Sequence, residues 1–183
     1  MGQYFNLINE SKKQYVCCYC LDGLAKWYEW VFNDIFKLLG LLIRKSDDSG
    51  GGDLNFDEKH ANIVGSWAGD KISLVGDYDS SGLYDIAREQ YKNISEELIE
   101  AWNDSIDMDE YKLNFTPCND CPKSDKFQKM LKKYKFGYDE YNNDYKQFLW
   151  DLRKKLNKYY ITEKDVKENR NINVKISRWK IST

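Results

Sequence analysis

The sequence predicts a single α+β domain, in which a small antiparallel sheet packs against amphipathic helices. A length of 183 residues suits one domain. Aromatic residues make up 15% of the chain and hydrophobic residues 42%, which is enough for a core although 32% of the residues are charged. Short β-prone runs alternate with longer runs that repeat apolar residues every three or four positions. We therefore expect one domain over residues 1–183, with a flexible, glycine-rich loop at residues 46–53.

Four segments have the pattern of strands. Residues 4–8 and 15–19 are β-prone, and the polar residues 9–13 between them have the length of a hairpin loop. Residues 72–78 and 172–181 alternate polar and apolar side chains. The expected sheet thus contains an N-terminal hairpin, a central strand and a C-terminal strand.

Helices are predicted between and after these strands. Residues 24–42 carry a wide apolar stripe, which Gly40 is expected to end or kink. Ser80 or Ser81 is expected to cap a helix beginning near Leu83, and Ser95 to cap the next one. Two further helices are expected over residues 125–136 and 138–160.

Charge is distributed unevenly along the chain. Residues 1–122 have a net charge of −11 and residues 123–183 a net charge of +9, so that the whole chain has a net charge of −2. This balance excludes a uniformly basic nucleic-acid-binding protein. It favours association with a complementary surface, in a homo-oligomer or with a protein partner.

The composition also bears on the compartment. The first 15 residues lack the basic and apolar regions of a signal peptide, and the most apolar stretch, residues 31–43, is too short and too charged to span a bilayer. Five cysteines, an odd number, favour free thiols in a reducing compartment. We expect a cytoplasmic protein. The abundance of Lys, Asn, Ile and Tyr is typical of an AT-rich genome such as that of a protist, a low-GC bacterium or a large DNA virus, and a viral protein would lie in the host cytoplasm or the virion.

Two motifs resemble those of a known family. The chain opens Met-Gly-Gln-Tyr-Phe, and residues 65–78 read GSWAGDKISLVGDY. The first half of the chain resembles a family of small uncharacterised proteins of fungi, other microbial eukaryotes and large viruses, which open MGQYW and carry a GxWAGDxIxLVGDY core. Phe5 stands where that family has Trp. The family carries no activity to transfer, so the resemblance implies only that residues 63–79 are a structural signature.

Two cysteine pairs have the spacing of zinc ligands. Cys17 and Cys20 form one C-x-x-C pair, and Cys118 and Cys121 form the other. On a regular strand Cys17 and Cys20 would point to opposite faces, so a zinc site requires a turn there. The sequence favours the other interpretation, a set of buried thiols in the core, so no cofactor is expected and zinc is the alternative.

A short acidic segment has some features of a calcium loop. Oxygen-bearing side chains follow one another at Asp77, Asp79, Ser81 and Asp85. Arg88 stands where such a loop has its bidentate Glu, and a strand rather than a helix precedes the segment. The alternative is a strand end followed by a turn and a capped helix.

His60 is the only histidine and thus the leading candidate for a general base. With Asp70 and Asp77 of the acidic segment 70–79 it defines a hydrolase-like or metal-dependent enzyme as one alternative. Asp70 and Asp77 flank a predicted strand, which favours their lying at its opposite ends. The other interpretation of His60 is a solvated surface residue.

The basic last third is the candidate for binding nucleic acid, because its cations stand among aromatic residues. The candidate residues are Lys132, Lys133, Lys135, Arg153, Lys154 and Lys155. The alternative is that the aromatic residues form the buried stripe of the helix at 138–160. The function that the sequence favours is a non-catalytic binding or assembly protein, as a homodimer for example, with an enzyme and a nucleic-acid-binding protein as alternatives.

Overall fold

The computed structural model confirms the α+β class. It describes residues 2–21, 25–32, 35–45, 58–108, 111–115, 118, 121, 129, 132–133, 143–156 and 161–169. Within these residues, no helix is both long enough and apolar enough to cross a bilayer.

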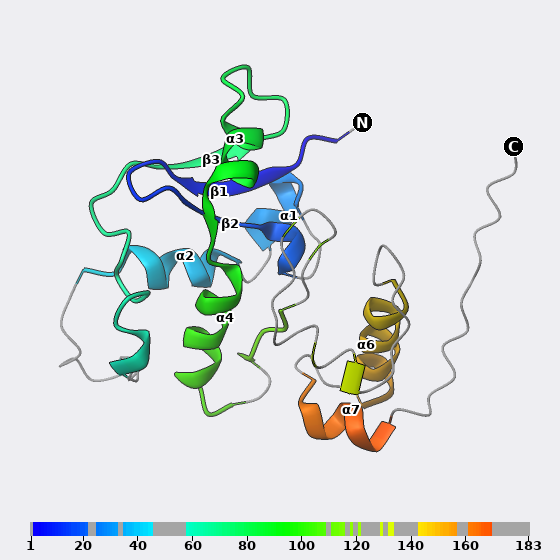
Figure 1. The fold of residues 1–183 in the computed structure, drawn as a ribbon. Coiled ribbons are helices and arrows are strands. Elements are labelled where there is room, and N and C mark those ends of the chain that lie inside the picture. The colour runs from blue at the N-terminus through cyan, green and yellow to red at the C-terminus, as the bar shows by residue number, and fades with distance from the viewer. Residues whose placement is uncertain are drawn as a thin grey trace, which may run out of the picture.

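The sheet has four strands in the order β3-β1-β2-β4 (Figure 1). Strands β1 (Phe5–Asn9) and β2 (Gln14–Val16) form the predicted antiparallel hairpin, with Leu7 opposite Val16. Strand β3 (Ile72–Gly76) pairs antiparallel with the other edge of β1, and the short β4 (Lys92–Asn93) pairs parallel with β2. The sheet is therefore mixed, because β4 adds a parallel pair that the sequence analysis did not anticipate.

Helices cover both faces of the sheet (Figure 1). On one face Leu7 and Val16 join a core with α1 (Trp27–Phe32), α2 (Ile35–Ile43) and α4 (Ser95–Asp104). On the other face Ile8 and Tyr15 pack with α3 (Leu83–Gln90) and with four cysteines. Since adjacent strand residues point to opposite faces, the central strand β1 contributes side chains to both cores.

Two sequence-based boundaries are wrong. Strand β2 ends at Val16, and a 3₁₀ turn, η1 (Cys18–Cys20), replaces the rest of the strand expected over residues 15–19. The helix expected over residues 24–42 is two helices, α1 and α2, and Gly40 lies exposed inside α2 without ending it. Apolar spacing alone does not reveal the break between the two helices, because the apolar residues of both continue one stripe in the sequence.

The segment at residues 63–70 closes the end of α2. Gly65 N–H donates to Leu41 O at 2.9 Å, and Trp67 N–H donates to Leu42 O at 2.9 Å, so two carbonyls at the helix end are satisfied. Gly65 has a φ of +65°, and a Cβ there would lie 2.5 Å from Arg44 O. The Trp67 indole is fully buried and donates from Nε1 to Gln14 Oε1 at 2.7 Å.

The basic third contributes α6 (Asn143–Leu156) and α7 (Glu163–Asn169) (Figure 1). Phe148, Leu149 and Leu152 of α6 are buried, as expected for the apolar stripe of the helix predicted over residues 138–160. The loop expected at residues 46–53, the C-terminal strand expected at 172–181 and most of the helix expected at 125–136 lie outside the described residues.

Candidate metal centre

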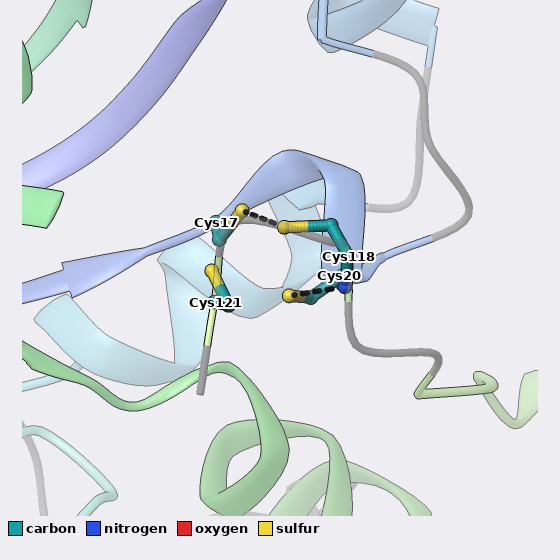
Figure 2. Close-up of side chains that lie close together, drawn as sticks. All are labelled: Cys17, Cys20, Cys118 and Cys121. Carbon is teal, nitrogen blue, oxygen red and sulfur yellow. Dashed lines mark hydrogen bonds between the residues drawn. The ribbon is translucent and has the colours of Figure 1, made fainter. Parts of the chain in front are cut away.

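The four cysteines of the two C-x-x-C pairs come together. The Sγ atoms of Cys17, Cys20, Cys118 and Cys121 all lie within 4.8 Å of one another, and all four residues are buried (Figure 2). Cys17 Sγ and Cys118 Sγ are 3.7 Å apart, and these residues are 101 positions apart in the chain. All of the cysteines are free thiols.

The turn after β2 is what brings Cys17 and Cys20 to the same side. Cys20 N–H donates to Cys17 O at 3.1 Å, and Leu21 N–H donates to Cys18 O at 2.9 Å. Across from it, Cys121 N–H donates to Cys118 O at 3.4 Å, so each C-x-x-C pair is closed by a backbone hydrogen bond between its two cysteines. The sequence analysis required such a turn for a zinc site, and the structure contains it.

The distances fit a tetrahedral metal ion better than disulfides. Zinc–sulfur bonds of about 2.3 Å give a tetrahedron whose sulfur–sulfur edges are about 3.8 Å. The 3.7 Å between Cys17 Sγ and Cys118 Sγ matches such an edge. A disulfide would need these sulfur atoms at about 2.05 Å.

Other groups already point at the sulfur atoms. The Tyr15 hydroxyl lies 3.4 Å from Cys121 Sγ, and Cys118 N–H donates to Cys20 Sγ at 3.5 Å (Figure 2 shows the second contact). Asn93 Nδ2 lies 3.9 Å from Cys20 Sγ. Such donors suit thiolates, since a metal bound by four thiolates carries negative charge into a buried site.

Ser95 ties the turn to α4. Its hydroxyl accepts from Cys17 N–H at 2.8 Å and donates to Asn93 Oδ1 at 2.6 Å. Ser95 is therefore not the cap that the sequence suggested. The N-cap residue is Ile94, and just before it Asn93 Oδ1 accepts from Ser95 N–H at 3.0 Å.

The four thiols do not all behave alike without a bound metal: Cys17 and Cys20 are held protonated, but Cys121 is not. Hydrogen bonds to Cys118, together with burial, raise the pKa of the Cys17 and Cys20 thiols. The hydrogen bond with Cys118 raises the pKa of the Cys121 thiol, but those with Cys17 and Cys20 lower it overall. Burial, followed by the hydrogen bond to Cys121, raises the pKa of the Tyr15 hydroxyl, which therefore stays a donor. A metal ion binding here would displace the thiol protons.

The two aspartates of the catalytic hypothesis lie at opposite ends of β1. Asp70 Oδ2 accepts from Asn9 Nδ2 at 2.8 Å, and Asp77 Oδ1 accepts from Tyr4 N–H at 3.0 Å. Tyr4 and Asn9 are five strand residues apart, or about 17 Å. The two carboxylates thus hold the ends of a strand and do not form a pair.

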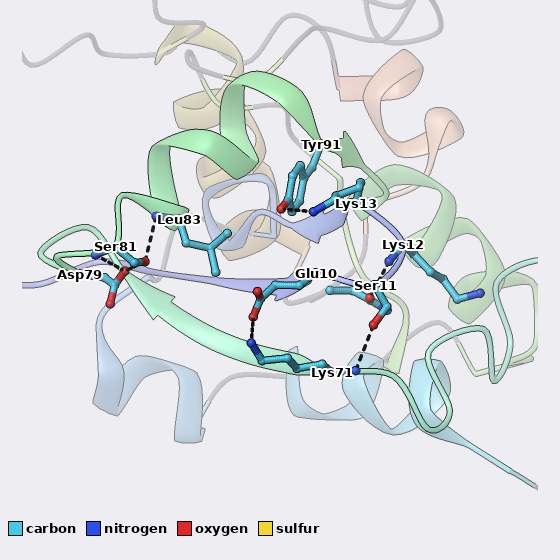
Figure 3. Close-up of polar contacts among 10 residues, drawn as sticks. Glu10, Ser11, Lys12, Lys13, Lys71, Asp79, Ser81, Leu83 and Tyr91 are labelled. Atoms are coloured by element: carbon cyan, nitrogen blue, oxygen red, sulfur yellow. Dashed lines mark hydrogen bonds and ion pairs between the residues drawn. The ribbon is translucent and has the colours of Figure 1, made fainter.

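The residues of the calcium hypothesis serve a turn and a helix start. Asp79 Oδ2 accepts from Ser81 N–H at 3.0 Å and also from the Ser81 hydroxyl, and Ser81 Oγ accepts from Leu83 N–H at 3.2 Å (Figure 3). Asp77 is bonded to Tyr4, and Asp85 lies in the first turn of α3. Within the described part of the chain, the four cysteines are the one group of three or more His, Cys, Asp or Glu side chains close enough to share an ion.

His60 is buried and faces α4 instead of residues 70–79. Its Nε2 lies 2.8 Å from Asp104 Oδ2, which also pairs with Lys59 Nζ at 2.7 Å. Hydrogen bonds from Lys59 and His60 lower the pKa of the Asp104 carboxyl. These three residues, with Asn62, Ile63, Glu97 and Glu100, line a cavity of about 390 Å³. The expected solvated histidine is thus a buried one.

The basic candidates lie partly within the described residues. Lys132, Lys133, Lys154 and Lys155 are exposed, Arg153 is half-buried, and Lys135 lies outside the described residues. Lys133 pairs with Glu163, and Lys155 Nζ donates to Asn169 Oδ1 at 2.9 Å. At least these two cations have partners within the basic third itself.

The sequence analysis did not identify three residues that contact these sites: Tyr15, Asn93 and Asp104. Each reaches its partner across 44 or more positions in the chain. No local spacing signals such a contact, and only the pairing of the strands and helices could have revealed it.

Comparison of the chain with protein-family models, curated proteins and solved structures gave no match.

Proposed function

We propose that this chain is a non-catalytic binding or assembly protein whose fold is held by a structural zinc ion. The observation that carries this proposal is the convergence of four buried cysteine sulfurs within 4.8 Å. The chemistry of four thiolates in a tetrahedron suits zinc or iron. Zinc is the better fit to a purely structural role because it has no redox chemistry.

The ligand set argues against a catalytic metal. A catalytic zinc keeps one position open for water or substrate, whereas four protein ligands fill the tetrahedron. Here all four ligands are buried, and Cys17 and Cys20 have no exposed surface. The metal would join the turn after β2 to residues 118–121 and add stability where the core around α3 is small.

The charge distribution supports the assembly part of the proposal. Residues 1–122 have a net charge of −11 and residues 123–183 a net charge of +9. Opposite charges on separate surfaces steer association and make its rate depend on salt.

Native mass spectrometry tests the zinc. We expect one zinc ion per chain, retained on dilution and released by denaturation in a strong chelator. The proposal is contradicted if the protein binds no zinc when it is refolded with zinc. It is also contradicted if the Cys118→Ser variant binds zinc as well as the wild type does. If the protein instead contains one iron ion per chain, seen as a visible absorption band, the proposed site stands but its metal is iron.

Sedimentation at low and high salt tests the assembly. We expect a self-associated species or a captured partner whose association weakens as salt rises. A monomer at both salt concentrations that captures no partner would count against an assembly function while leaving the zinc site standing.

The cavity beside His60 supports a second candidate, an enzyme or small-molecule-binding protein. A buried histidine paired with a carboxylate is a common arrangement for a general base. The cavity of about 390 Å³ lies within the usual size range for small ligands. Thermal-shift screening tests this candidate: a ligand that stabilises the protein but not His60→Gln supports it, and a screen in which both respond alike rejects it.

A further inference from the structure

Strand β3 forms one edge of the sheet. The strand order β3-β1-β2-β4 gives β3 one neighbour, β1, among the described strands. Ile72, Ser73 and Leu74 are half-buried, as expected for residues at a sheet edge. Figure 3 shows Lys71 just before β3, bonded across to Glu10 and Ser11.

The hydrogen bonds at both ends of β3 fix which of its groups face outward. Asp77 N–H donates to Tyr4 O at 2.8 Å, and Glu10 N–H donates to Lys71 O at 3.3 Å. In an antiparallel pair the direction alternates with each residue. Ser73 and Val75 therefore bond to β1, whereas Ile72, Leu74 and Gly76 turn their backbone groups away from it.

These outward groups leave a bonding edge available. Among the described residues, no backbone partner is found for the outward N–H and C=O of Ile72 and Leu74. Gly76 O accepts from Asp79 N–H at 3.0 Å, and its N–H faces the same edge. An edge strand of this kind is a template for another strand.

We propose that this edge pairs with the same edge of a second copy of the chain. The two β3 strands run antiparallel about a two-fold axis at Leu74, which lies opposite Leu74 of the second copy. In this register Ile72 lies opposite Gly76 of the second copy, so every outward N–H meets an outward C=O. Gly76 O would accept this hydrogen bond in addition to the one from Asp79 N–H. The two sheets join into one continuous sheet.

The flanking charges select this register. Lys71 and Asp77 are equally distant from Leu74, so the two-fold axis places Lys71 of each copy opposite Asp77 of the other at both ends of the pair. The Lys71 side chain is 73% exposed and the Asp77 residue is partly exposed. A register shifted by two residues in one direction would place Lys71 opposite Val75 and lose both charge pairs. The opposite shift would place Lys71 opposite Asp79. It would also place Ile72 opposite Tyr78, which lies in the turn after β3.

The small residue at the strand end makes room for the Gln3 side chain of the same copy. Gly76 carries the Gln3 side chain against it, since a Cβ at Gly76 would lie 2.2 Å from Gln3 Nε2. Ile72 and Leu74 already pack against the core that contains α2 and α4. Pairing would cover their remaining exposed surface, which adds apolar burial to the backbone hydrogen bonds.

The inference rests on the assembly part of the proposed function, and a matched pair of variants tests it separately. Ile72→Pro removes an outward N–H without removing a bond to β1, and the start of an edge strand accepts proline. Ile72→Ala makes a similar loss of side chain but keeps the N–H. In sedimentation over a concentration series, we expect the wild type and Ile72→Ala to dimerise and Ile72→Pro to dimerise about tenfold or more weakly, because two symmetric hydrogen bonds are lost.

Amide hydrogen exchange gives a second reading on the unmodified protein. Ser73 and Val75 amides are bonded to β1 and should exchange slowly at every protein concentration. The Leu74 amide should exchange rapidly in dilute solution and become protected as the concentration rises.

Three outcomes are decisive. A dimer that Ile72→Pro does not weaken relative to Ile72→Ala uses another surface and overturns this inference, while the assembly function stands. Protection of the Leu74 amide that does not change with concentration points to an occupant from the same chain and also overturns it. A wild type that is monomeric at all concentrations overturns both the inference and a homodimeric function.

Discussion

Two segments tie distant parts of this chain together, and they do so differently. The segment at residues 63–70 finds all its partners within the chain: Gly65 and Trp67 bond to the end of α2, and Asp70 bonds to Asn9. At the cysteine junction, the four sulfurs lie mainly beside one another. A thiol is a weak partner for another thiol, which is why we propose that a metal ion completes this junction. Residues 63–70 therefore complete the fold, whereas the four cysteines form a candidate binding site.

The largest expected effect is at the cysteine junction. Cys118→Ser removes one of four metal ligands, so we expect loss of stoichiometric zinc and destabilisation by at least about 3 kcal/mol, because structural zinc contributes on the order of 10 kcal/mol to small domains. Chemical denaturation with and without zinc measures the change.

Cys18→Ala is the matched control for that experiment. Cys18 is equally buried in the same turn but belongs to neither C-x-x-C pair. It should lose packing energy yet keep one zinc per chain. Loss of zinc in both variants would show that the site depends on general packing and not on the four ligands.

The next effect contrasts two glycines. Gly65→Ala places a methyl group 2.5 Å from Arg44 O at a φ of +65°, and we expect it to lower the free energy of unfolding by about 2 kcal/mol. Gly40→Ala meets no atom within 4 Å inside α2 and should raise it by about 0.5–1 kcal/mol. Thermal melting of the two variants checks the sign of each; equal effects would contradict the role given to residues 63–70.

Removal of the Tyr15 hydroxyl should weaken the binding of the metal without unfolding the protein. Tyr15→Phe takes away the donor 3.4 Å from Cys121 Sγ, and partners of this kind commonly change metal affinity by about tenfold. Competition with a chelator measures the affinity, and the absorption bands of the cobalt-substituted protein should shift.

Tyr84→Phe is the control, because Tyr84 is buried in the same core and its ring lies beside the Arg88 guanidinium, with Cζ 5.5 Å from the ring centre. Equal loss of affinity in both variants would assign the effect to packing.

The smallest expected effect is at Asp104, which pins the turn η2 (Glu58–His60) to α4. The folded-state pKa of this carboxyl is lower than the usual 3.8, so its contribution is present above that value and is lost as pH falls through the lower, folded-state pKa. Asp104 is 44% exposed, which keeps the contribution small. Asp104→Asn should therefore flatten the acid limb of the stability curve and leave the cysteine junction intact. An unchanged acid limb would contradict this role.

The sequence predicted much of the sheet because its strands follow local rules. The hairpin of β1 and β2 and the strand after Asp70 all show in alternation and loop length. The sequence did not predict the break between α1 and α2, because an apolar stripe that spans two helices looks continuous. It did not predict the two-residue strand β4 either, because a parallel pair depends on residues that are distant in the chain.

The candidate metal centre was predictable in its ligands and not in its geometry. The spacing of the two C-x-x-C pairs identified the cysteines, but whether they converge depends on the turn that begins after Val16. For His60 the sequence suggested partners in residues 70–79. The structure gives it Asp104, which lies 44 positions away on α4.

The separation between the two cysteine pairs also orders events during synthesis. Cys118 is made 101 residues after Cys17. At a translation rate of about 5–20 residues per second, the first pair waits roughly 5–20 s for the second. Strands β1, β2 and β3 all precede Cys118 in the chain, so they can pair before the junction closes. A chain that ended before Cys118 would contain these three strands but lack half of the cysteine cluster, which would leave Cys17 and Cys20 open to any competing metal ion.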